Sequence, residues 1–272
     1  MTTKFRSFVF ATILFAPALL AAQQMTSPKW ITVGREVVKP GKDAAHAKHE
    51  AAWARANEAA KIPAATLAMV AMSGPNEAWW LTGFESAEAI QKYNETIDAT
   101  PALAAVSAKY YPPEADYLAN TFQMIARYRD DLSYTTGSPM TALRYMLVSR
   151  IGVKLGHNAE FVEARKMIKA AHEKAKATDG YAVYQVTAGA PAGTFLVFAG
   201  KQSMADLDAN PHGDAYTAAL GGTDGEKKLN DMLMSYEGSS DTNLFRLSPS
   251  MSILNKQWWD ADTYWKPKAA KK

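Results

Sequence analysis

A segment of twelve residues occurs twice in this chain, and the duplication limits the fold more than any other feature does. Residues 33–44 return as residues 148–159, with the same residue at six of the twelve positions. The shared residues are two valines, an arginine, a lysine, a glycine and an alanine. In both copies β-branched residues precede the glycine and an amphipathic pattern follows it, which predicts a strand that turns into a helix. We therefore expect a tandem repeat.

The predicted elements follow the same order in both copies, because alternating apolar runs and helical stripes recur at matching distances. The first copy is predicted to contain a strand, helix, strand, strand, broken helix and strand at residues 30–38, 43–60, 66–72, 78–84, 87–120 and 122–129. The second copy is predicted to repeat this order at residues 145–154, 159–177, 181–187, 194–199, 203–236 and 244–247.

Four segments follow from this pattern. We expect the first repeat at residues 27–134, a turn-rich linker at 135–141, the second repeat at 142–255 and a C-terminal tail at 256–272. The tail is aromatic and then basic, so its indole rings are expected to dock on the folded body.

The first 22 residues are typical of a secretory signal peptide. Lys4 and Arg6 precede an apolar run at residues 8–20, and small residues follow it. The run is shorter than the roughly 18 residues that span a bilayer. We expect cleavage after Ala22 and a periplasmic or secreted protein. The chain has no cysteine, which excludes disulfides, thiolate metal sites and lipid-modified cysteine.

The charge balance does not indicate nucleic acid as a partner, and after signal cleavage no membrane association is expected. The chain has 30 basic and 27 acidic residues, and loss of Lys4 and Arg6 with the signal peptide leaves a net charge of +1. Four of the remaining lysines lie in the last seven residues, so the rest of the mature chain is slightly acidic. The sequence leaves open whether the protein is a monomer or a homo-oligomer.

The predicted order is that of the ferredoxin-like βαββαβ unit. Two such units, each with the duplicated Val-x-Arg-x-x-Val-Lys-x-Gly turn, resemble the dimeric α/β-barrel superfamily, which includes antibiotic-biosynthesis monooxygenases, the chlorite dismutase group and NIPSNAP-like proteins. The resemblance implies an α+β fold in which two tandem ferredoxin-like repeats pack sheet to sheet as one intramolecular barrel, with the helices outside. The sequence contains no catalytic signature of these families and no histidine that matches a haem ligand.

Four arginines occupy duplicated strand positions. Arg35 and Arg150 share a position in the first strand of each copy, and Arg127 and Arg246 share one in the last strand. First and last strands are neighbours in the ferredoxin-like order, so arginines that face the lumen would gather around a carboxylate, a phosphate or another anion. Alternatively, they lie at strand ends and pair with nearby acids.

Large aromatic residues lie in the central strands. Trp79 and Trp80 are adjacent, so one ring faces the helices and the other faces the barrel; Tyr181 and Tyr184 also lie on opposite faces of their strand. We expect Trp80 and Tyr184 to contact a flat apolar or aromatic ligand. The alternative is that these rings simply fill the barrel.

His46 and His49 lie three residues apart on the first predicted helix and could face one metal ion. Their HAKHE segment is not a zinc-hydrolase motif, and no third ligand is evident. The same positions of the second helix carry the apolar stripe, so we expect both histidines to pack beneath their own helix. The sequence predicts no metal site and no cofactor.

Two classes of function remain. The first is an exported, non-enzymatic binding protein that holds a small anionic or aromatic ligand between the sheets, with the repeated arginines at its polar end. The second is a cofactor-independent monooxygenase-like or haem-dependent enzyme of the superfamily. The lack of an acid–base constellation favours the first class. A lumen packed solid would favour neither, and would indicate a structural or interaction role.

Overall fold

The computed structural model describes residues 27–136, 138–208 and 213–266. The predicted signal peptide at 1–22 lies outside the described residues, as does the end of the predicted tail.

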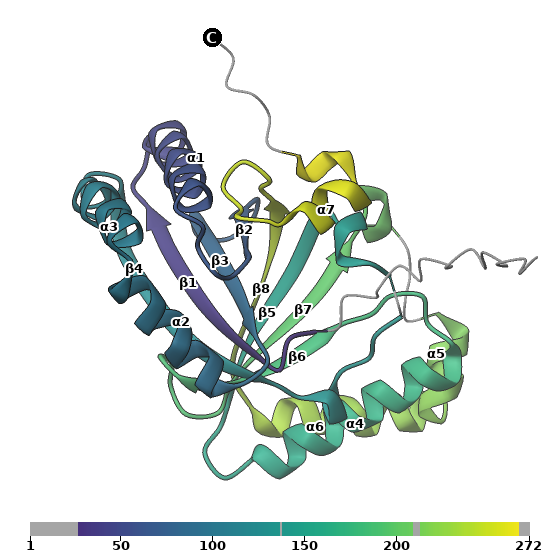
Figure 1. Cartoon of the computed structure of the whole chain (residues 1–272). Coiled ribbons are helices and arrows are strands. Elements are labelled where there is room, and N and C mark those ends of the chain that lie inside the picture. The colour runs from purple at the N-terminus through teal and green to yellow at the C-terminus, as the bar shows by residue number, and fades with distance from the viewer. Residues whose placement is uncertain (1–26, 137, 209–212, 267–272) are drawn as a thin grey trace, which may run out of the picture.

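The first half of the chain forms a sheet whose outer face is covered by helices (Figure 1). Its elements are β1 (Trp30–Val38), α1 (Asp43–Ala59), β2 (Thr66–Ala71), β3 (Glu77–Phe84), α2 (Ala87–Ala99), α3 (Pro101–Glu114) and β4 (Leu118–Tyr128).

The second half repeats this arrangement. Its elements are β5 (Tyr145–Val153), α4 (Asn158–Ala175), β6 (Ala182–Ala188), β7 (Thr194–Lys201), α5 (Asp214–Leu220), α6 (Thr223–Tyr236) and β8 (Glu237–Leu247). Short 3-10 turns lie at η1 (Asp130–Leu132), η2 (Met140–Ala142) and η3 (Met204–Leu207), and the tail forms α7 (Lys256–Ala261) and η4 (Thr263–Trp265).

The strands close into one antiparallel barrel with the order β1-β3-β2-β8-β5-β7-β6-β4. Within each half this is the ferredoxin-like order. Two seams join the halves, because β2 pairs with β8 and β4 pairs with β6. The predicted fold is therefore confirmed: two βαββαβ repeats in one chain form a dimeric α/β barrel.

The duplicated glycine has the same role in both halves. Gly41, between β1 and α1, has φ +76°, and Gly156, between β5 and α4, has φ +88°. An L-residue with a side chain rarely adopts this left-handed conformation, whereas glycine does so without steric cost. The repeated glycine thus serves the turn from strand to helix.

The barrel lumen is filled by apolar side chains, which point inward from alternate positions of the strands. This cluster is completed by residues of the tail and comprises Ile31, Val33, Leu67, Met69, Trp79, Met124, Ala126, Leu143, Met146, Val148, Tyr184, Leu196, Phe198, Phe245, Leu247, Leu254, Trp258 and Trp265. The helices bury the outer faces of the sheets over separate clusters. No helix among the described residues combines the length and the apolar character that crossing a membrane requires.

The tail docks at the end of the barrel where β5 begins and β8 ends. Trp265 is only 1% exposed, and its Nε1 donates a hydrogen bond of 2.6 Å to the backbone oxygen of Thr141. Tyr264 donates a bond of 2.7 Å from its hydroxyl to the backbone oxygen of Leu247. The tail is thus part of the core that closes this end.

Two strands are longer than the sequence pattern predicts. β8 begins at Glu237 instead of residue 244, and β4 begins at Leu118 instead of residue 122. The added part of β8 is polar, and it pairs with the second half of β5. Hydrophobic alternation cannot reveal a strand of this kind, because the partner strand determines its conformation.

Replacement of Trp265 by alanine is expected to destabilise the protein strongly. It removes a fully buried ring, at a cost of about 3–5 kcal/mol, which corresponds to a melting temperature lower by roughly 10 °C. Leu155→Ala is the control, because Leu155 is 85% exposed and its truncation should change stability by less than about 0.5 kcal/mol. Equal melting temperatures of the two variants would show that the tail does not belong to the core.

Candidate functional site

Arg35 and Arg150 lie near the same end of the barrel. β1 and β5 are four strands apart in an antiparallel barrel, so they run in the same direction. Each arginine is paired with an acid: Arg35 Nη2 lies 2.6 Å from Glu77 Oε1, and Arg150 Nε lies 3.0 Å from Asp241 Oδ1. The Arg35 guanidinium also lies 4.8 Å from the ring centroid of Trp79. Both charges are thus compensated within the chain.

The other two duplicated arginines lie on the outside. Arg127 and Arg246 are exposed, and each is one position away from a buried residue of the lumen, Ala126 and Phe245 respectively. Adjacent residues of a strand point to opposite faces. The structure therefore does not gather four guanidinium groups in the lumen.

The aromatic candidates divide between the two faces of the barrel. Tyr184 faces the lumen, and its hydroxyl donates a bond of 3.0 Å to the backbone oxygen of Pro28. Trp80 does not line the lumen: it packs beneath α1, and Trp79 is the lumen-facing ring. The sequence predicts that the two rings point to opposite faces of the strand, but it does not reveal which ring faces the lumen and which faces the helices. The pairing of β3 with β1, which sets Trp79 opposite Arg35, decides it.

Haem, which the fold resemblance implies, does not fit the lumen. Apolar side chains fill the space, and none of the histidines in the described part of the chain belongs to the lumen cluster. His46 and His49 lie on α1, His172 lies on α4, and His157 is at the turn before α4. No step of haem chemistry follows from this arrangement.

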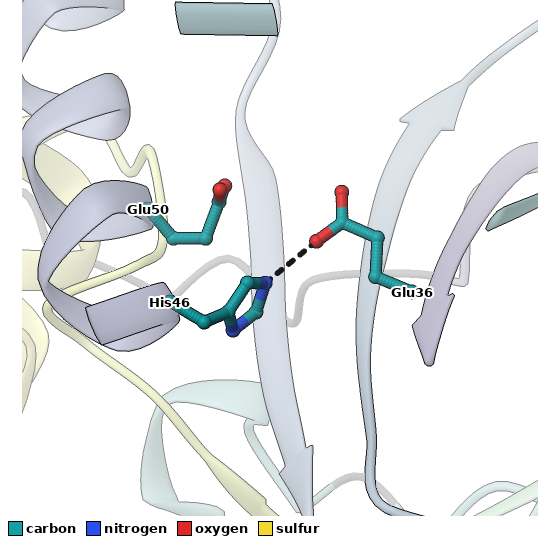
Figure 2. Close-up of side chains that lie close together, drawn as sticks. All are labelled: Glu36, His46 and Glu50. Atoms are coloured by element: carbon teal, nitrogen blue, oxygen red, sulfur yellow. Dashed lines mark hydrogen bonds and ion pairs between the residues drawn. The ribbon is translucent and has the colours of Figure 1, made fainter. Parts of the chain in front are cut away.

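A cluster of histidine and glutamate side chains lies between β1 and α1, on the outer face of the first half (Figure 2). Glu36 follows the inward-facing Arg35 on β1, so its side chain points away from the lumen. His46 and Glu50 are four residues apart on α1 and therefore project from one side of the helix. Figure 2 shows the three side chains directed toward a common space.

This group is tightly packed and shielded from water. His46 Nε2 lies 2.8 Å from Glu36 Oε2, and ligand atoms from Glu36, His46 and Glu50 all lie within 4.8 Å of one another. His46 is 3% exposed and Glu50 is 2% exposed. The ring of Trp80 packs edge-on against His46, with 6.0 Å between the ring centroids. The three groups thus meet in surroundings of low polarity.

A second group shares Glu50. Ligand atoms of His49, Glu50 and Glu114 also lie within 4.8 Å of one another. However, His49 Nε2 forms a hydrogen bond of 3.0 Å with the backbone oxygen of Tyr110. Because a carbonyl oxygen can only accept, that nitrogen carries the proton, and a metal ion bound through it would break the bond to Tyr110. His46 Nε2 faces the carboxylate of Glu36 instead, so a metal ion could replace the proton between two groups that are both ligands, and Glu36, His46 and Glu50 are the preferred ligand set.

The electrostatics of the cluster are unbalanced. In the described part of the chain, no lysine or arginine forms an ion pair with Glu36, Glu50 or Glu114. Burial, together with the charges of Glu36 and Glu114, raises the pKa of Glu50 to about 9. Burial and the charge of Glu36 raise the pKa of Glu114 to about 7. Glu50 Oε1 is buried and has no hydrogen-bond partner among the described residues.

These residues fit a divalent transition-metal ion. One imidazole and two carboxylates are ligands that Zn²⁺ and related ions accept. Ligand atoms around a tetrahedral zinc ion are about 3.4 Å apart, so small side-chain movements from the observed positions would suffice. A cation would also balance the carboxylates and coordinate the Glu50 oxygen that has no hydrogen bond among the described residues and lies 3.8 Å from His49 Nε2.

The sequence did not assign this group, because the third ligand lies on another element. His46, His49 and Glu50 are visible together, but Glu36 joins them only when α1 packs on β1. One signal was present in the duplication itself. The second helix carries Phe161 at the position equivalent to His46, so a polar residue replaces an apolar one at this buried position of the first helix.

The metal-free protein is expected to become less stable between about pH 5 and pH 8. The pKa of Glu50 is raised from 4.5 to about 9 on folding, so the folded state holds this proton more tightly than the unfolded chain does. Its contribution therefore favours folding at low pH and is lost as the pH rises through this range. Glu114, whose pKa is also raised, contributes to the pH dependence in the same direction. The other titratable groups of the cluster are Glu36, His46 and His49. Thermal unfolding in EDTA at a series of pH values measures the effect.

Glu50→Gln keeps the shape of the side chain and removes its titration. This variant should show a flatter pH dependence and, near pH 8, a melting temperature higher by roughly 5 °C. Glu88→Gln, at an exposed ion pair with Lys92, is the control and should follow the wild type. If Glu50→Gln also follows the wild type at every pH, Glu50 is not the source of the effect.

Comparison with known proteins supports the fold alone. No protein-family model and no curated protein matches the chain. An anthrone oxidase-like protein superposes with a TM-score of 0.53 at 11% identity, over 83% of this chain and 93% of that one. A proposed monooxygenase from Fusobacterium nucleatum subsp. nucleatum ATCC 25586 gives a TM-score of 0.50 at 10% identity, over 82% and 94%. A mutant chlorite dismutase from Candidatus Nitrospira defluvii gives 0.48 at 11% identity, over 84% and 95%. The closed barrel and the first two of these superpositions give the chain the fold of the dimeric α/β barrels, with both halves in one polypeptide.

Proposed function

We propose that the protein is an exported, non-enzymatic metal-binding protein that holds one divalent transition-metal ion between Glu36, His46 and Glu50. The observation that carries the proposal is the convergence of these three buried side chains, without a lysine or arginine paired to the carboxylates among the described residues. A buried carboxylate is costly unless a proton or a cation compensates it.

The burial of the ligands favours binding over catalysis. Structural metal sites are closed by protein ligands, whereas catalytic sites keep one position open for water or substrate. His46 and Glu50 lie on the buried side of α1. The second group places His49 and Glu114 next to Glu50 as further possible metal ligands. A metal ion here would tie β1 to α1 and to the end of α3, and would stabilise the first half of the barrel.

The arginines of the lumen are less suited to hold a ligand. An anion would have to displace Glu77 from Arg35 or Asp241 from Arg150, and both pairs already compensate the charge. We therefore place the ligand on the outer face of the first half, as a cation in place of the anionic or aromatic ligand expected from the sequence. The alternative, an enzyme of the superfamily, rests on the shared fold alone.

Export is part of the proposal and rests on the sequence. Lys4 and Arg6, the apolar run after them and the small residues at 21–22 have the order of a signal peptide. Carboxylate and imidazole ligands suit an oxidising compartment, because they do not form disulfides as thiols do.

Zinc titration of the EDTA-treated mature chain is expected to give one equivalent of bound metal by calorimetry. Zinc at 100 times its dissociation constant should raise the melting temperature by about 5–10 °C, since binding to the folded state adds about 2.7 kcal/mol. We expect zinc to bind about 100-fold or more weakly to each of three variants: Glu36→Gln, His46→Gln and Glu50→Gln. Even the loss of a residue that only hydrogen-bonds to a metal ligand lowers metal affinity by about 10–100-fold.

His157→Gln is the matched control. His157 lies 3.4 Å from Glu160 and is partly exposed, so it offers a histidine–glutamate pair outside the cluster. Circular dichroism should confirm that all variants are folded. If the wild type binds zinc no more tightly than the triple variant of Glu36, His46 and Glu50, the metal-binding function is wrong.

A further inference from the structure

The second half of the chain carries the opposite charge at the equivalent place. Arg165 on α4 occupies the position of Glu50 on α1, at the 115-residue offset of the duplication. The positions of Glu36 and His46 are taken by Ile151 and Phe161. Where the first half collects carboxylates beneath its helix, the second half places a guanidinium beneath the equivalent one.

Arg165 lies among tyrosines. Its guanidinium carbon is 4.8 Å from the ring centroid of Tyr181, and Tyr216 and Tyr236 are close enough to affect its charge. Tyr181 is 8% exposed and Tyr236 is 1% exposed, and both belong to the apolar cluster between the second sheet and its helices. The walls around the guanidinium are therefore largely aromatic.

Two donors in this group have no acceptor. Arg165 Nε and the Tyr181 hydroxyl are buried, and neither has a hydrogen-bond partner among the described residues. Nor does any carboxylate in the described part of the chain form an ion pair with Arg165. Burial lowers the pKa of this arginine, although an arginine keeps its charge in proteins. A buried charge without a counter-ion is costly, so the group is suited to an anionic partner.

The tyrosines keep their protons near neutral pH. Burial raises the pKa of Tyr181 to about 12, although the Arg165 charge acts in the opposite direction. The hydroxyl of Tyr181 is therefore a donor that can point at a ligand oxygen, next to the N–H groups of Arg165. The Nε of Arg165 is buried, whereas the residue as a whole keeps an exposed part, so a small molecule would reach the guanidinium from that exposed side.

We propose that Arg165 and Tyr181 form a binding site for a small monocarboxylate with an apolar or aromatic body. One guanidinium balances one negative charge, and its planar fork matches the two oxygens of a carboxylate. A doubly charged phosphate would leave one charge uncompensated against aromatic walls. The rings around Arg165 give the apolar body of the ligand a surface to contact. This site lies in the other half of the barrel and does not depend on the proposed metal ion.

The test is titration of benzoate into the mature chain by calorimetry, in EDTA so that metal does not contribute, with acetate and inorganic phosphate as further probes. Saturable binding of one benzoate is expected, with acetate weaker and phosphate weaker by about tenfold or more. Tyr181→Phe keeps the ring and removes the donor, and should weaken benzoate binding by roughly threefold to tenfold. Arg165→Met removes the charge and should weaken it by more than about tenfold.

Lys166→Gln is the control, because it removes the same charge from the adjacent, exposed residue and should change benzoate binding less than about twofold. Arg165→Met is expected to fold, since it replaces an unpaired charge by an apolar side chain of similar length. The proposal is overturned if benzoate shows no saturable binding, or if Arg165→Met and Tyr181→Phe both bind it like the wild type. Phosphate binding as tight as that of benzoate would overturn the assignment to carboxylates.

Discussion

Backbone pairing across the two seams of the barrel is the constraint on which the rest of this structure depends. Each half alone is an open sheet whose edge strands present unpaired N–H and C=O groups. Pairing of β2 with β8 and of β4 with β6 satisfies those groups and creates the lumen. Because the inner faces of the sheets line the lumen, the helices pack on the outer faces, as Figure 1 shows for α1 and α4.

Closure of the barrel also determines where polar chemistry can lie. The lumen is occupied by apolar side chains and closed at one end by the tail, and its duplicated arginines are paired with Glu77 and Asp241. Two ionisable groups with a buried atom that lacks a hydrogen-bond partner among the described residues, Glu50 and Arg165, lie on the outside, on the first helix of each half. There the two copies differ in the sign of the ionisable group, with Glu50 in one half and Arg165 in the other. The common fold therefore offers room for the two proposed sites, one for a cation and one for an anion.

The sequence predicted the order of the elements well, because the duplicated turn and the hydrophobic alternation are local signals. It predicted β8 poorly, because residues 237–243 are polar and form a strand only through β5. It also did not bring together the residues of the candidate site. Trp80 was assigned to the lumen because alternation gives two faces without saying which is inside. Glu36 and Glu50 meet only through the packing of a helix on a strand, which no spacing along the chain reveals.

The central claim is that Glu36, His46 and Glu50 hold one metal ion. Anomalous diffraction at the zinc absorption edge, from crystals of the mature protein grown with zinc, tests it most directly. The account predicts a single strong peak between β1 and α1, about 2.0–2.2 Å from a nitrogen of His46 and from oxygens of the two glutamates. A zinc-replete crystal with no peak at these residues, or with peaks only at exposed side chains, would contradict it.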